Sequence, residues 1–192
     1  SSPFDGIDEA LDIFSSVLKP QGTIGMVCNT AHYFAKLIDK KAKFYGISFI
    51  NMPEYTLKYI ALSNLNKSCC VLCTQGTKTA KIYNQTNHDG LEILYPSDKQ
   101  CEEVQSIIYQ IKDTANVDYI KTALKLARLM EKIGDYTFIL ACTELSILDK
   151  SLLGQASIVD AMDILSMMLV NKSGYRIKMV DNRYDEKIIR TM

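Results

Sequence analysis

The sequence lacks an excess of charge, a long apolar run and an N-terminal leader pattern, and each absence excludes a class of protein. Lys and Arg together number 22 and Asp and Glu also number 22, so the net charge of the 192 residues is zero. A balanced chain offers no basic surface for nucleic acid and no polybasic patch for a membrane. The apolar runs have the length of strands, well short of the roughly 20 residues that cross a bilayer. We therefore expect a small-molecule partner, with no nucleic acid and no membrane.

Patterns for metal binding and for disulfides are also missing from the six cysteines. Cys69, Cys70 and Cys73 crowd one apolar segment, where neighbouring side chains point to opposite faces, so they indicate free thiols in a reducing cytoplasm. Cys70 and Cys73 have the spacing of half a zinc site, but no second pair follows, and Cys101 and His88 are isolated. The sequence predicts a cytoplasmic protein without a bound metal.

Segments with the character of strands alternate with segments of helical spacing along the chain. The predicted strands are residues 23–27, 47–50, 69–73, 91–95, 136–141 and 158–159. The predicted helices are residues 5–18, 30–41, 54–62, 80–84, 98–112, 117–133 and 160–170. Strands that are apolar on both faces indicate parallel sheets covered by helices on both sides, so we predict an α/β fold with two similar lobes.

The predicted lobes divide the chain into three parts. The first lobe spans residues 1–62 and the second spans residues 63–155, with the active site in the cleft between them. Residues 156–192 hold a helix that returns to the first lobe, followed by a tail. The pattern does not place the tail from residue 171 onward.

Two predicted strands end in a cysteine followed by small polar residues. Cys28 opens the sequence CNT, and Cys142 opens the sequence CTE. Ligands of open α/β sheets bind beyond the carboxyl ends of the strands, so one cleft could collect both thiols. A helix that starts just after each thiol is expected to lower its pKa. Either cysteine alone also fits a small core residue, but two such thiols could remove a proton from one face of a carbon and return one to the other.

A third polar loop follows the predicted strand 69–73 and reads Thr74-Gln75-Gly76-Thr77. A strand, a Gly-containing loop and a helix in this order aim backbone N–H groups at an anion. The spacing of a P-loop is absent, so a carboxylate is a better ligand than a triphosphate. An ordinary turn from strand to helix is the alternative reading of the same residues.

These three motifs, in this order, resemble those of the aspartate/glutamate racemase family, the cofactor-independent racemases related to glutamate racemase. The family carries Cys-Asn-Thr, Thr-x-Gly-Thr and Cys-Thr-Glu or Cys-Thr-His after successive strands, and Tyr83 corresponds to its usual tyrosine. The likeness runs from about residue 5 to about residue 170. Two departures stand out. The family's first strand with its Gly-rich turn, and an arginine soon after it, have no counterpart here, and Leu165 stands where members carry a histidine.

The resemblance implies an isomerase that racemises an acidic amino acid, aspartate before glutamate, without pyridoxal phosphate or metal, as a homodimer. Cys28 and Cys142 would be the two catalytic groups, and His32 would support the site from behind. The implied substrate-binding residues are Asn29, Thr30, Thr74, Gly76, Thr77, Lys112, Thr143 and Glu144.

Several of these residues have ordinary alternative roles. His32 could instead be a structural histidine, and Lys112 could be a solvated lysine at the end of a helix. Glu144 could be an acidic residue that stabilises the first turn of a helix. The threonines also fit helix caps. For the whole chain, the alternatives are a related isomerase or decarboxylase, which often keeps one of the two cysteines, and a non-catalytic protein that binds a dicarboxylate or an amino acid.

Overall fold

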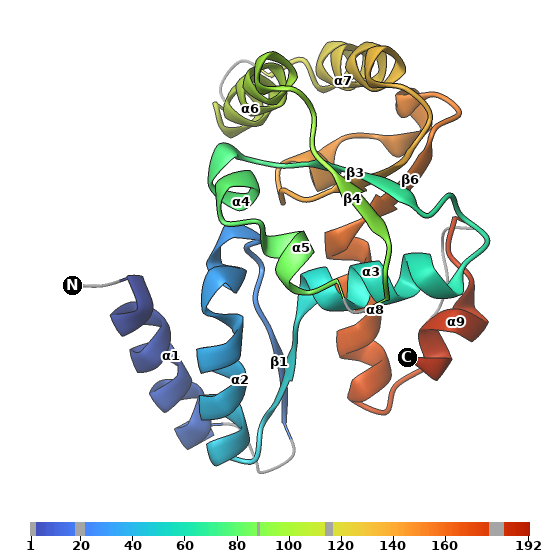
Figure 1. Ribbon diagram of the computed structural model, residues 1–192. Coiled ribbons are helices and arrows are strands. Elements are labelled where there is room, and N and C mark those ends of the chain that lie inside the picture. Colours follow the sequence, from blue (N-terminus) through green and yellow to red (C-terminus); the bar gives the residue numbers. More distant parts are fainter. Residues whose placement is uncertain (1–2, 18–21, 88, 114–116, 177–182) are drawn as a thin grey trace.

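The computed structural model describes residues 3–17, 22–87, 89–113, 117–176 and 183–192 (Figure 1). Its strands form two parallel sheets, one in the order β1-β2 and one in the order β4-β3-β5-β6. The strands are β1 Thr23–Gly25, β2 Ser48–Ile50, β3 Ser68–Leu72, β4 Glu92–Leu94, β5 Thr137–Leu140 and β6 Ser157–Asp160. The predicted α/β fold with parallel sheets in two lobes is confirmed.

Helices connect the strands and cover the sheets. The α-helices are α1 Pro3–Val17, α2 Ala35–Phe44, α3 Met52–Leu62, α4 Gln75–Thr79, α5 Ile82–Gln85, α6 Asp98–Lys112, α7 Tyr119–Ile133, α8 Ala161–Lys172 and α9 Glu186–Thr191. The 3-10 helices are η1 Thr30–Phe34, η2 Leu145–Ile147 and η3 Lys150–Leu153. None of the helices within the described residues combines the length and the apolarity that a bilayer crossing requires.

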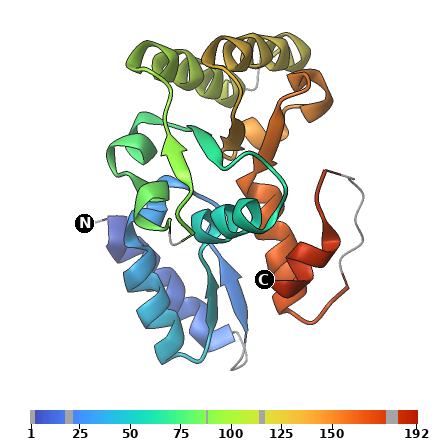
Figure 2. The same ribbon diagram turned by 45° about the vertical axis from the view of Figure 1, so that its right-hand side comes forward.

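The four-stranded sheet is buried on both faces. In β3, Cys70 and Leu72 pack toward α6 and α7, whereas Cys69 and Val71 belong to a second core between the two sheets. The helix α8 starts at the end of the four-stranded sheet and packs against β1 of the other sheet, while α3 lies beside it (Figures 1 and 2). These helices hold the two sheets together, so the carboxyl ends of strands from both sheets have fixed relative positions.

The register of β3 and β5 brings their ends level. Leu72 pairs with Leu140, and the backbone N–H of Ala141 donates to the carbonyl oxygen of Leu72 at 2.9 Å. Because the strands are parallel, the residues that follow them emerge at one edge of the sheet. The loops that begin at Thr74 and Cys142 are therefore neighbours.

One predicted helix has the observed span, and the start of another is corrected by the structure. Helix α6 begins at Asp98 as predicted and is capped by Ser97 in a capping box with Gln100. Thr30 does not cap a long helix. It begins η1, because the backbone N–H of His32 donates to the carbonyl oxygen of Asn29 at 3.1 Å, the spacing of a 3-10 turn, and α2 starts only afterwards.

The unplaced tail contains the helix α9, which packs on α8 and α3 (Figure 2). Ile189 is fully buried, the amide of Asn171 donates to its carbonyl oxygen at 3.0 Å, and the ammonium of Lys172 donates to the carbonyl oxygen of Met192 at 2.9 Å. The tail is thus an integral part of the fold at its described residues.

Candidate active site

Three threonine hydroxyls join the loop after β1 to the loop after β3. The Oγ1 atom of Thr30 lies 2.8 Å from that of Thr77 and 3.3 Å from that of Thr74. A Cβ atom on Gly76 would lie 3.2 Å from the Cγ2 atom of Thr30, so glycine permits this close approach. The contact brings together the Cys28 motif of one sheet and the polar loop of the other, which borders Cys142.

Asn29, which precedes Thr30 in the sequence, is buried and has one amide donor without a partner among the described residues. Its Oδ1 atom accepts a hydrogen bond from the hydroxyl of Tyr83 at 2.7 Å. Burial raises the pKa of Tyr83 well above its usual value, so the hydroxyl keeps the proton that it donates. The Nδ2 atom of Asn29 has no hydrogen-bond partner among the described residues. Buried donors are seldom left unpaired, so Asn29 has a hydrogen-bond donor that the described part of the fold does not use.

His32 holds the backbone of Cys28 in place. Its Nδ1 atom lies 2.7 Å from the carbonyl oxygen of Cys28, and its Nε2 atom accepts from the backbone N–H of Met52 at 3.2 Å. Because Nε2 accepts, the ring is neutral and Nδ1 carries the proton that bonds to Cys28. Burial lowers the pKa of His32 to about 4, which keeps the ring neutral. The histidine therefore supports the backbone of Cys28, and its predicted role behind a substrate site stays a prediction.

This depressed pKa predicts a pH dependence of stability. Between about pH 6.5 and pH 4 the unfolded chain protonates His32 and the folded chain does not. The free energy of unfolding should therefore fall as the pH decreases through that window, by on the order of 3 kcal/mol from this residue. In His32→Gln the fall should be shallower, as measured by urea unfolding at pH 7, 6 and 5. Parallel pH profiles for the two proteins would contradict the assignment.

Cys28 is exposed, and it lies three residues beyond the end of β1. The predicted strand 23–27 is thus shorter in the structure, and the thiol stands on the loop before η1. Its backbone is fixed by His32 while its side chain is open to solvent. An exposed thiol on a fixed backbone is free to meet a ligand.

Cys142 has a different environment. It is buried, and its Sγ atom donates to the Oε2 atom of Glu144 at 2.8 Å. Burial, and then the hydrogen bond to Glu144, raise the pKa of Cys142 to about 12. The predicted lowering of this pKa is therefore wrong for Cys142. The helix that follows, η2, has only three residues, and the group nearest the sulfur is a carboxylate.

Glu144 connects Cys142 to the end of α6. The ammonium of Lys112 lies 3.3 Å from the Oε1 atom of Glu144, and the hydroxyl of Thr143 donates to Oε2 at 3.1 Å. Burial acts to raise the pKa of Glu144, but hydrogen bonds from Cys142 and from its own backbone N–H, together with Lys112, lower it overall. Glu144 is therefore a carboxylate at neutral pH, held between a thiol and a cation.

Replacing Glu144 with Gln should lower the pKa of Cys142, because the carboxylate accepts the thiol proton and repels the thiolate. At a pH below both pKa values, the thiolate fraction of Cys142 rises about tenfold for each unit that the pKa falls, and the alkylation rate should rise about threefold, because a thiolate of lower pKa is a weaker nucleophile. The measurement is alkylation between pH 7 and 9, with each cysteine followed by mass spectrometry. Glu131→Gln, an exposed substitution on α7, is the matched control. An unchanged Cys142 profile would contradict the assigned pKa shift.

All the predicted site residues except Lys112 lie in the segments directly after strands β1, β3 and β5, either on the loop itself or in the short helix that follows it, η1 or α4. Within the described residues, no three His, Cys, Asp or Glu side chains gather in a group that could hold a metal ion. Asp160, the last residue of β6, was not among the predicted site residues. Its position at the end of a strand repeats the polar strand ends of the other three loops, but its partners come from distant parts of the chain.

Fold and site together define a parallel α/β protein with two lobes, in which loops from the ends of three strands carry thiols, hydroxyls and a buried amide. The model of the family described as Asp/Glu/Hydantoin racemase matches residues 20–169 of the chain, and the chain belongs to this family.

Solved structures of low sequence identity share the fold. Aspartate racemase from Picrophilus torridus superposes with a TM-score of 0.76 at 22% identity, over 99% of this chain and 75% of that one. An aspartate racemase homologue from Pyrococcus horikoshii OT3 gives a TM-score of 0.69 at 21% identity, over 86% and 72% of the two chains. Glutamate racemase from Aquifex pyrophilus superposes with a TM-score of 0.53 at 22% identity, over 89% of this chain and 67% of that one.

Proposed function

We propose that this protein racemises an acidic amino acid, aspartate in preference to glutamate, by a two-base 1,1-proton transfer with Cys28 and Cys142. Family membership supports an isomerase of the racemase type. The observation that carries the proposal is the contact between Thr30 and Thr77, at 2.8 Å, because it joins the loop of one thiol to the loop beside the other. We further propose a cytoplasmic homodimer, and the six free cysteines are consistent with a reducing compartment.

The substrate α-carboxylate would be bound by Asn29 and by the hydroxyls of Thr30, Thr74 and Thr77. Thiols are weak bases toward an amino-acid α-proton, so the reaction needs donors for the charge that moves onto the carboxylate when the proton leaves. A cluster of hydroxyls and a buried amide donor without a partner supply such donors in a fixed arrangement. The backbone at Gly76 borders the same space.

The two thiols would act from opposite faces of the α-carbon. In one direction the Cys28 thiolate takes the proton from the carbon, and the Cys142 thiol donates its proton to the other face. Cys142 is suited to start as the acid, because its pKa of about 12 keeps it protonated at neutral pH. The reverse direction begins with the proton on Cys28 and the charge on Cys142, where Lys112 acts to stabilise the thiolate.

Lys112 would bind the side-chain carboxylate of the substrate. It ends α6, its charge is held by Glu144, and its side chain is 48% exposed, so a second carboxylate can reach it. Glu144 would then orient Cys142 on one side and Lys112 on the other.

Circular dichroism tests the proposal directly. The purified protein should drive the ellipticity of L-aspartate and of D-aspartate to zero, and should act more slowly on either enantiomer of glutamate. Stable ellipticity with both amino acids, together with aspartate binding in a calorimeter, would contradict it and favour a binding protein.

A further inference from the structure

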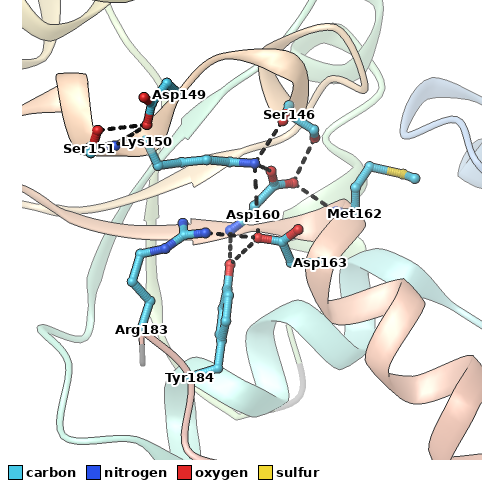
Figure 3. A network of polar contacts seen from close by, with 9 residues as sticks. All are labelled: Ser146, Asp149, Lys150, Ser151, Asp160, Met162, Asp163, Arg183 and Tyr184. Atoms are coloured by element: carbon cyan, nitrogen blue, oxygen red, sulfur yellow. Dashed lines mark hydrogen bonds and ion pairs between the residues drawn. The ribbon is translucent and has the colours of Figure 1, made fainter. Parts of the chain in front are cut away.

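A buried carboxylate, that of Asp160, contacts Ser146 and Lys150 from the segment that follows β5 (Figure 3). Asp160 is fully buried at the end of β6. Its Oδ1 atom accepts from the hydroxyl of Ser146 at 2.7 Å and from the backbone N–H of Met162 at 2.9 Å, and the ammonium of Lys150 lies 2.8 Å from its Oδ2 atom. A charge buried this deeply is stable only with its partners in place, so it fixes their positions in turn.

Two of these partners belong to the turn that follows β5. The backbone N–H of Ser146 donates to the carbonyl oxygen of Thr143 at 3.2 Å, and the ammonium of Lys150 donates to the carbonyl oxygen of Ser146 at 2.7 Å. On the opposite side, Leu145 and Leu148 are buried in the core under α7. The turn from Cys142 to Lys150 is therefore held by apolar packing on one side and by Asp160 on the other.

The C-terminal tail completes this arrangement. The backbone N–H of Asp160 donates to the hydroxyl of Tyr184 at 3.0 Å, and that hydroxyl donates to Asp163 at 3.0 Å. Tyr184 packs edge-on against Tyr59, with ring centroids 5.5 Å apart. Tyr184 lies beyond residue 169, where the family match ends, so this contact is a feature of the chain outside the matched region.

We propose that Asp160, paired with Lys150 and bonded to Tyr184, is a positioning residue that fixes the turn carrying Cys142 and Glu144. Asp160 acts through Ser146, which is two residues from Glu144 and four from Cys142. Misplacement of a catalytic group by about 1 Å can lower a rate by about 100-fold, so a network that holds the turn has a direct effect on the chemistry. The catalytic part of this inference rests on the proposed function, whereas the structural part does not.

The first test is thiol labelling, which needs no activity. Ser146→Ala removes only the hydroxyl that bonds to Asp160, and Ser151→Ala removes a hydroxyl of the same segment that bonds to Asp149 instead. Under limiting iodoacetamide, the labelling of Cys142 relative to the exposed Cys28 should rise at least threefold in Ser146→Ala and should not change in Ser151→Ala. An unchanged ratio in Ser146→Ala overturns the proposal.

Buried cysteines elsewhere separate local loosening from unfolding. Cys70 and Cys73 are almost fully buried in the core, so they should stay unlabelled in Ser146→Ala. Labelling of all the cysteines together would show that the substitution unfolds the protein, and would overturn a local positioning role. Tyr184→Phe, which removes the other hydroxyl bonded to Asp160, should raise Cys142 labelling in the same selective way.

The second test is exchange of the α-proton of aspartate with D2O. Because Cys142 is the base in one direction and the acid in the other, Ser146→Ala should slow exchange of both enantiomers by the same factor, about tenfold or more, and Ser151→Ala should not. An exchange rate in Ser146→Ala equal to that of the wild type would overturn the catalytic part of the inference. If the wild type catalyses no exchange, the proposed function is wrong, and the labelling result still decides whether Asp160 fixes the turn.

Discussion

Replacing either Cys28 or Cys142 with alanine is expected to lower the rate of aspartate racemisation by at least about 1,000-fold. Each direction of the reaction uses one thiol as the base and the other as the acid, and a positioned acid or base contributes roughly 100- to 10,000-fold. The measurement is the decay of ellipticity from each enantiomer. Cys69→Ala is the matched control, because Cys69 lies near the start of β3, away from the carboxyl ends of the strands, and should retain activity.

The two variants should differ in the exchange that they keep. With the acid missing, the remaining thiol can still remove the α-proton of its own enantiomer and return one from solvent. Cys28→Ala and Cys142→Ala should therefore retain exchange, if any, on opposite enantiomers. Substantial racemisation by either variant would exclude the two-base mechanism.

Lys112→Met is expected to lower kcat/KM for aspartate by about 10- to 100-fold. A hydrogen bond to a charged group contributes about 1.5–3 kcal/mol, and each 1.36 kcal/mol is a factor of ten in rate. The expected loss does not exceed about 100-fold, because the Lys112 side chain is half exposed and water screens its interaction with the substrate. Initial rates of racemisation at several aspartate concentrations give the value.

Two controls separate binding from structure. Lys99→Met changes an exposed lysine on the same helix and should leave kcat/KM unchanged. Lys112→Arg keeps the positive charge and should recover part of the activity. If Lys112→Met had the kcat/KM of the wild type, Lys112 would not bind the substrate, and its proposed role would be wrong.

The strand-end positions of the three motifs were predictable from the sequence, because they depend on short-range patterns. Runs such as residues 69–73 and 138–141 are apolar at every position, which indicates central parallel strands. The small polar residues that follow such a strand must lie at its carboxyl edge. The hydrogen bond between Tyr83 and Asn29 was not predictable, since it joins residues 54 positions apart.

The direction of the pKa shift of Cys142 could not be predicted from the sequence. The sequence suggested a helix start that would lower the pKa of the thiol. The pKa is instead raised, because the sulfur is buried and because the side chain of Glu144 turns back toward it. The role of Asp160 was hidden for a similar reason. Its partners Ser146 and Tyr184 are brought to it by tertiary packing, and the tail that carries Tyr184 has no periodic apolar pattern.

The most direct test of the two-base mechanism is the position of deuterium early in the reaction. L-Aspartate is incubated with the wild-type protein in D2O, and the two enantiomers are separated and examined by NMR and mass spectrometry before about a tenth has reacted. The mechanism predicts that the D-aspartate formed carries deuterium at the α-carbon while the remaining L-aspartate keeps its original proton. Product that retains the original proton, or deuterium that enters the L-aspartate as fast as D-aspartate forms, would contradict it.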